Sequence, residues 1–183
     1  HSALAKRIEQ IRANFKGNIE ETVAAYQADP STLANLTPDV AAYVQLEALR
    51  LETLEQFKTK MKTASTQEKK ALAKASRMLS DIDEFISYGL TEPVLQDLMS
   101  GLQTARNGRN RTGLKDLFTE FMQSIVRILG FQSKEISTLT AFAHDTARLI
   151  QVVEGIELED KLLGLDKLFS RTEDTKQAYE ERV

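Results

Sequence analysis

The sequence predicts an all-α protein, an irregular antiparallel bundle of six or seven helices. Apolar residues recur at steps of three and four along most of the 183 residues, as one face of a helix requires. Helix breakers are few, with only 8 Gly and 3 Pro. No segment shows the strict alternation of a half-buried strand. We expect a single helical domain over residues 1–171, followed by a polar C-terminal helix or tail over residues 172–183.

The most apolar stretch, residues 114–153, carries two helical patterns in succession and is the expected core hairpin. Gly130 stands between the patterns, where a helix end takes up a left-handed turn. Ser133 is placed to cap the helix that follows. Because the connection is short, the two helices should be antiparallel neighbours.

Two long helices are expected at the N-terminal end. The first spans residues 3–28, with a bend at Gly17-Asn18 because glycine weakens a helix interior. The second runs from residue 38 to about 62, with Thr37 as its cap and Pro38 at its first position. One arrangement that the pattern allows is a two-stranded coil of these two helices.

A capping-box pattern, Ser65 followed by Glu68, opens a third helix that should continue to Gly89. A shorter helix begins at Thr91-Glu92-Pro93, and a seventh is expected within residues 158–169, beyond the core hairpin. The far face of the third helix is basic and holds Lys69, Lys70, Lys74 and Arg77.

Composition narrows the class of protein. A formal net charge of -3 gives no general attraction to nucleic acid or to anionic membranes, so such binding requires a local patch. With no Cys there is no disulfide, thiol nucleophile or thiolate metal site. No apolar run is long enough to span a membrane, and the N-terminus lacks a signal-peptide pattern. We expect a soluble chain, cytoplasmic or exported.

The chain does not begin with Met. We therefore expect His1-Ser2 to be a non-native extension, and the chain to be part of a larger protein whose other segments carry any targeting signal or catalytic domain.

The sharpest local anomaly is the stretch 106–113, which has three arginines and two glycines but no acid. Arginine offers forked donors to phosphate or carboxylate, and the start of the following helix adds a positive dipole end. Solvated turns explain the same residues, because the lysine of a phosphate loop is absent. The candidate anion or partner site consists of Arg106, Arg109, Arg111 and Lys115.

Other motifs for chemistry are weak. His144-Asp145 lacks the further ligands that a metal-dependent hydrolase needs, since His1 is the only other histidine. Two acidic clusters, residues 81–84 and 154–160, are typical of solvated faces. We predict no catalytic residue, no metal site and no cofactor.

The leading hypothesis is a non-catalytic helical domain that binds a partner protein through a helical face, because the apolar stripes are wider than one bundle needs to bury. Homodimerisation satisfies the same pattern. The second hypothesis is an anion-binding module that uses the arginine loop to bind a lipid headgroup, nucleic acid or phosphorylated partner. The third is an enzyme whose Asp and Glu residues meet only in the fold.

Overall fold

The computed structural model describes residues 3–102 and 116–130, and every regular element in these two ranges is helical. The all-α prediction is therefore confirmed. The elements in chain order are α1 (Ala3–Asn14), α2 (Ile19–Ala28), the short 3₁₀ helix η1 (Pro30–Asn35), α3 (Pro38–Met61), α4 (Thr66–Arg77), α5 (Ile82–Thr91), α6 (Pro93–Ser100) and α7 (Leu117–Ile128).

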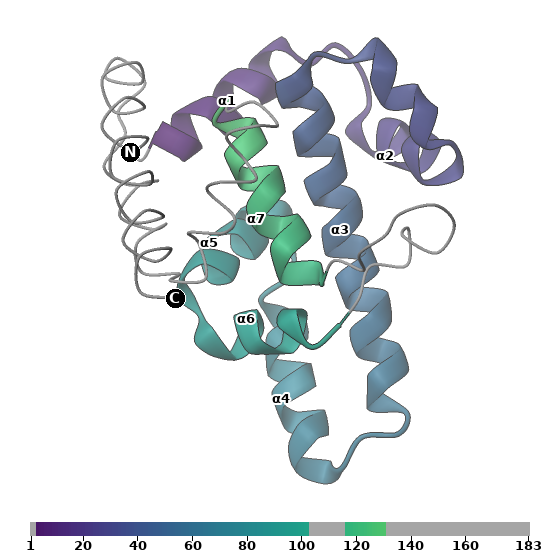
Figure 1. The fold of residues 1–183 in the computed structure, drawn as a ribbon, viewed down its shortest axis with the longest axis vertical. Coiled ribbons are helices and arrows are strands. Elements are labelled where there is room, and N and C mark those ends of the chain that lie inside the picture. The colour runs from purple at the N-terminus through teal and green to yellow at the C-terminus, as the bar shows by residue number, and fades with distance from the viewer. Residues whose placement is uncertain (1–2, 103–115, 131–183) are drawn as a thin grey trace, which may run out of the picture.

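Helices α3 and α7 form the centre of the fold (Figure 1). They are antiparallel, because Arg7 of α1 reaches both Asp39 at the start of α3 and Ile128 at the end of α7. Helix α7 is covered on nearly every side, and even Gln123 and Ser124 are buried. This part of the predicted core hairpin is confirmed as core, whereas its second helix, from residue 131 onward, lies outside the described residues.

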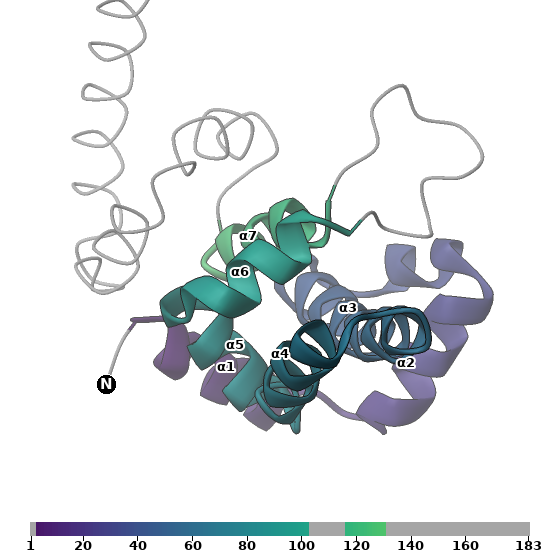
Figure 2. The same cartoon turned by 90° about the horizontal axis from the view of Figure 1, so that it is seen from below.

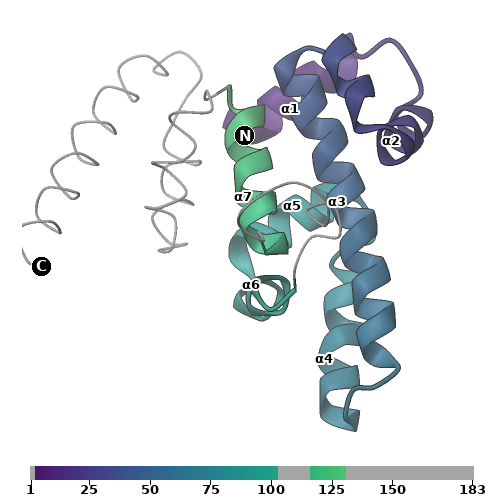
Figure 3. The same ribbon diagram turned by 45° about the vertical axis from the view of Figure 1, so that its right-hand side comes forward.

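The other helices surround this pair. Helix α2 packs against the first half of α3 through a small cluster of Val23, Tyr26, Val44 and Ala48. Seen from below, α3 and α4 lie side by side, with α2 on one side and α5, α6 and α7 on the other (Figure 2). The far ends of α3 and α4 extend beyond the other described helices (Figure 3).

The predicted long first helix is wrong, because it is two helices. Helix α1 ends at Asn14, and α2 begins at Ile19 with Asn18 as its N-cap. The Asn18 side chain accepts hydrogen bonds from the backbone N–H groups of Glu20 (2.8 Å) and Glu21 (3.3 Å). The Asn residue thus starts a new helix instead of bending an old one. With α1 this short, a two-stranded coil of residues 3–28 with α3 does not form.

The predicted third helix, residues 65–89, is also divided. Helix α4 ends at Arg77, and α5 begins at Ile82 with Asp81 as its N-cap, accepting from the Glu84 N–H at 2.9 Å. The apolar spacing continues across the break, so the pattern alone does not reveal it.

The helix-end predictions have mixed outcomes. The capping box of Ser65 and Glu68 is present, and Gly130 has a positive φ of 89°. Thr37 occupies the N-cap position of α3, but its side chain caps nothing. Its hydroxyl instead donates to Asp39 Oδ1 at 2.7 Å, and the same oxygen accepts from the Val40 N–H at 2.9 Å.

Candidate functional site

The predicted arginine site, Arg106 to Lys115, lies outside the described residues. What the structure fixes is the position of the two ends of this stretch. The Leu117 N–H donates to the Leu102 carbonyl at 2.9 Å, so the chain leaves and returns at one place, between α6 and α7. His144-Asp145 and the carboxylates of residues 154–160 also lie outside the described ranges.

The acidic cluster of residues 81–84 is described, and two of its members have structural partners. Asp81 caps α5, and Asp83 forms a bidentate pair with Arg12. Glu84 is exposed. The cluster therefore does not enclose a pair of carboxylates as acid–base chemistry requires.

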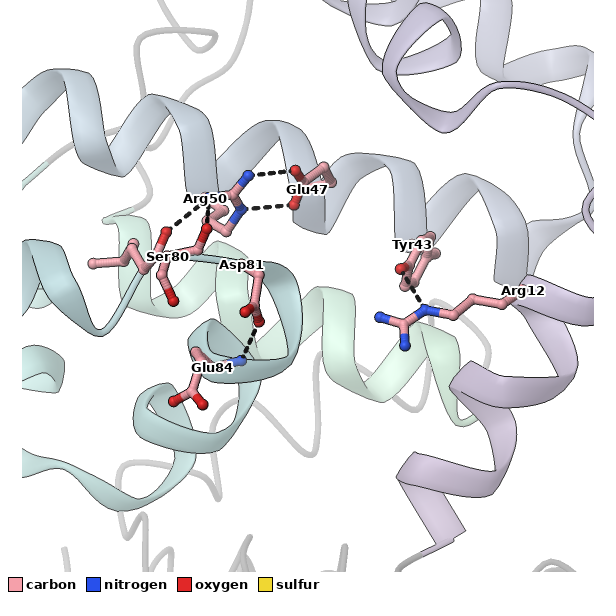
Figure 4. A network of polar contacts seen from close by, with 8 residues as sticks. Arg12, Tyr43, Glu47, Arg50, Ser80, Asp81 and Glu84 are labelled. Atoms are coloured by element: carbon pink, nitrogen blue, oxygen red, sulfur yellow. Dashed lines mark hydrogen bonds and ion pairs between the residues drawn. The ribbon is translucent and has the colours of Figure 1, made fainter.

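Arg12 joins three helices. Its two Nη atoms donate to the Asp83 carboxylate of α5 at 3.1 and 2.9 Å. Its Nε donates to the Tyr43 hydroxyl of α3 at 3.0 Å (Figure 4). The Asp83 hydrogen bonds raise the pKa of Arg12, so it stays charged. Burial raises the pKa of Tyr43. The arrangement holds α1 against α3 and α5.

Arg50 of α3 holds the connection between α4 and α5. Its Nε and Nη2 donate to the two carboxylate oxygens of Glu47 at 2.8 and 2.6 Å. Its Nη1 donates to the carbonyls of Leu79 (2.7 Å) and Ser80 (3.3 Å), which follow the end of α4 (Figure 4). These carbonyls lie beyond the end of α4, and the bond to Leu79 is partly buried, so Arg50 supplies a donor where water has limited access.

Arg7 has a similar role at the other end of the fold, where it pairs with Asp39 at 2.8 Å and donates to the Ile128 carbonyl at 3.4 Å. Desolvation opposes the charge on Asp39, but hydrogen bonds from Thr37 and Val40 and the charge of Arg7 leave its pKa lowered. These three arginines thus make most of the long-range polar contacts among the described residues, and in each case the contact holds segments of the fold together.

Within residues 3–102 and 116–130, no buried polar side-chain atom lacks a hydrogen-bond partner, and no group of His, Asp and Glu is placed to hold a metal ion. No helix in these ranges has both the length and the apolar character needed to cross a membrane.

The strongest surface feature is the projecting end of α3 and α4. We call residues 56–77 the basic hairpin, because they contain seven basic residues and a single acid, Glu68. All seven side chains are exposed. The basic residues are Lys58, Lys60, Lys62, Lys69, Lys70, Lys74 and Arg77.

Most of this charge has no ion-pair partner among the described residues. Of these seven residues, only Lys58 forms an ion pair with a described residue, Glu55, at 3.1 Å. The single acid is used by the capping box, where hydrogen bonds with Ser65 lower the pKa of Glu68 and the nearby charge of Lys60 lowers it further. Helices α3 and α4 pack against each other, so the basic residues of both helices belong to one hairpin.

A second charged surface has the opposite sign. Residues 78–102, which include α5 and α6, contain five acids and no Lys or Arg. The same segment carries the two exposed large hydrophobic side chains of the described residues, Tyr88 (37% exposed) and Val94 (42%). Acidic and apolar groups thus share one segment.

The sequence predicted the basic face of α4 but did not identify the hairpin as a site. The missed signal was the difference in charge between two consecutive segments. Residues 56–77 are strongly basic, whereas every charged residue within 78–102 is acidic. Comparison with protein-family models, with curated proteins and with solved structures gave no match to this chain.

Proposed function

We propose that this chain is a non-catalytic helical interaction domain that binds an acidic surface of a partner protein through the basic hairpin. The observation that carries the proposal is the distribution of charge. The formal net charge is -3, although residues 56–77 contain six more basic than acidic residues. Positive charge concentrated at a projecting end orients the approach of a negatively charged partner.

The chemistry of the hairpin favours a protein over nucleic acid or membrane. Six of its seven cations are lysines, which act as point charges and do not by themselves select phosphate over carboxylate. Its large apolar side chains Phe57 and Leu72 are buried, and Met61 is partly buried against the core. The hairpin therefore offers no ring for base stacking and little apolar surface for lipid. Elsewhere the chain has an excess of acids, which repels extended polyanions.

The shape of the hairpin supports the same conclusion. Two packed helices form a convex end about 20 Å across, given a helix diameter of roughly 10 Å. Such an end can enter a shallow acidic depression on another protein. The wide apolar stripes of the sequence predicted an exposed apolar surface for a partner. That surface is small, because the stripe of α3 is largely buried or half-buried against several neighbours.

The test is binding of a labelled polyglutamate peptide, measured by fluorescence anisotropy. Wild-type protein should bind at low salt and lose affinity in about 0.5 M salt, where charges are screened beyond a few ångströms. The double variant Lys70→Glu/Lys74→Glu should bind at least about tenfold more weakly, since two attractive charges become repulsive. The matched control Lys6→Glu/Lys16→Glu changes two exposed lysines of the N-terminal region and should bind like wild type.

Equal affinity of the hairpin variant and the wild type would refute the proposal. Binding of duplex DNA or phosphatidylserine vesicles without binding of polyglutamate would refute the protein partner and favour an anion-binding module.

The second candidate function is that anion-binding module, with Arg106, Arg109, Arg111 and Lys115 contacting phosphate or carboxylate. One observation supports it: the 2.9 Å hydrogen bond between Leu117 and Leu102 holds the two ends of the arginine stretch together. The triple variant Arg106→Ala/Arg109→Ala/Arg111→Ala should then lose binding to inorganic phosphate or to phosphatidylserine vesicles. Unchanged binding to both would count against it.

A further inference from the structure

We propose that the acidic surface recognised by the basic hairpin is the α5–α6 segment of a second copy of this chain. Two copies would form a reciprocal dimer, in which each hairpin lies against the other copy's α5 and α6. The inference rests on the proposed function and names its partner, so polyglutamate, which binds the same hairpin, should compete with the second copy and dissociate the dimer.

The α5–α6 segment has carboxylates available for such a contact. Of its five acids, Asp81 and Asp83 are already engaged, as the cap of α5 and the partner of Arg12. Glu84, Glu92 and Asp97 form no ion pair with any described residue, and Glu84 and Asp97 are exposed. They are three negative charges in a segment that contains no Lys or Arg.

Two of these carboxylates each share a helix face with an apolar side chain, so that one lysine side chain can contact both groups. Glu84 and Tyr88 are four residues apart on α5, and Val94 and Asp97 are three apart on α6, so each pair shares a helix face. A lysine can place its aliphatic stem on the apolar member and its ammonium group on the carboxylate. The Tyr88 ring can also accept a cation over its face.

The hairpin presents a matching ridge. Lys70, Lys74 and Arg77 are spaced by four and three residues and so lie along one face of α4. The opposite face carries Leu72 and Ala75, which are buried in the core. The ridge is therefore turned away from its own domain and is accessible to a second molecule.

A second copy satisfies both surfaces at once. Helices α4 and α6 pack against each other at the same end of the domain (Figure 1). A twofold axis beside that end can therefore place each hairpin against the other copy's α5 and α6. In such a dimer the twofold axis repeats the contact, so both hairpins and both acidic segments are occupied and no surface remains for a third copy. Reciprocity also doubles the area, which matters because a stable interface needs about 800 Å² per partner and a single hairpin end is small.

The experiment is sedimentation velocity of the whole chain at micromolar concentration and low salt. Wild-type protein should be a dimer that dissociates in about 0.5 M salt, because the contact is ionic. The hairpin variant Lys70→Glu/Lys74→Glu and the acidic-face variant Glu84→Lys/Asp97→Lys should each be monomeric. Mixed in equal amounts they should form a dimer again, because each inverted surface then meets its opposite charge.

The recovery on mixing also shows that both variants are folded. A wild-type chain that is monomeric, variants that remain dimeric, or a mixture that stays monomeric would overturn the inference. A monomeric wild type that still binds polyglutamate through the hairpin would overturn the second copy as partner and leave the proposed function standing. A monomeric wild type that binds no polyglutamate would overturn both.

Discussion

Gly89 of α5 lies against the ring of Phe121 of α7, and a Cβ atom added at Gly89 would come within 2.4 Å of Phe121 Cζ. Two more ring atoms would be 2.8 and 2.9 Å away. Phe121 is fully buried and is held by Phe85, edge-on with centroids 5.0 Å apart, and by Phe118, stacked at 6.2 Å. The absence of a side chain at Gly89 allows α5 to approach the central helix.

The variant Gly89→Ala should therefore be less stable. Overpacking of a core costs about 1 to 3 kcal/mol, whereas alanine in place of glycine returns about 1 kcal/mol of helix propensity. We expect a net loss of up to about 2 kcal/mol in the free energy of unfolding, measured in urea. The control is Gly101→Ala, whose added Cβ would lie 3.7 Å from its nearest neighbours and should cost little. A neutral Gly89→Ala would mean that the ring moves aside freely.

Arg50 gives a second prediction. Replacing it with Met removes two hydrogen bonds to carbonyls after α4 and leaves the Glu47 carboxylate without its partner. An unpaired buried polar group costs about 1 to 3 kcal/mol, and the Arg50 side chain is only 12% exposed, so a loss in this range is expected. Arg50→Lys should recover only part of it, because lysine lacks the fork.

The matched comparison for Arg50 is Lys58→Met. The Lys58 pair with Glu55 is well exposed, at 65% and 73%, and its removal should change stability by less than about 1 kcal/mol. Equal losses for the two variants, both measured by urea unfolding, would show that Arg50 does not hold the α4–α5 connection.

The features that the sequence predicted well are those set by neighbouring residues. Pro38 at the first position of α3, the Ser65–Glu68 box and the turn at Gly130 each follow from side chains within four positions of the helix end. The start of α6 at Pro93 belongs to the same group. Such signals need no knowledge of the rest of the fold.

The features that it missed depend on contacts between distant segments. The break between α4 and α5 is held by Arg50, which comes 29 positions before Leu79, while Leu79 and Ile82 keep helical spacing across it. The basic hairpin is a similar case. The lysines of α3 and α4 are two separate groups in sequence, and only the turn at residues 62–65 brings them together. The arginine site stays a prediction, because it lies outside the described ranges.

The capping box predicts a dependence of stability on pH. The pKa of Glu68 is lower in the folded chain than its usual value near 4.3 because Ser65 hydrogen-bonds its carboxylate. A lowered folded pKa stabilises the fold at neutral pH, and this contribution is lost as the pH falls below about 4 through the folded pKa. The pKa values of Asp29 and Asp39 are also lowered and act in the same direction.

The measurement is the free energy of unfolding at neutral pH and at about pH 3. Glu68→Gln should reduce the difference between the two conditions. Ser65→Ala should cost about 1 kcal/mol at neutral pH, the usual value for an N-cap, and less in acid. A pH dependence identical in Glu68→Gln and wild type would show that this carboxylate contributes nothing to it.

Gly130 gives the last prediction, and it concerns the end of the central helix. Its φ of 89° lies in the region that favours glycine, and its N–H donates to the Arg127 carbonyl at 2.9 Å, closing the last turn of α7. Alanine at this position must adopt a left-handed conformation, which costs about 1 to 2 kcal/mol, whereas asparagine adopts it more readily. Urea unfolding should therefore rank wild type above Gly130→Asn and Gly130→Asn above Gly130→Ala. If both variants matched the wild type, the chain after α7 would have to leave the helix by another backbone conformation at no cost.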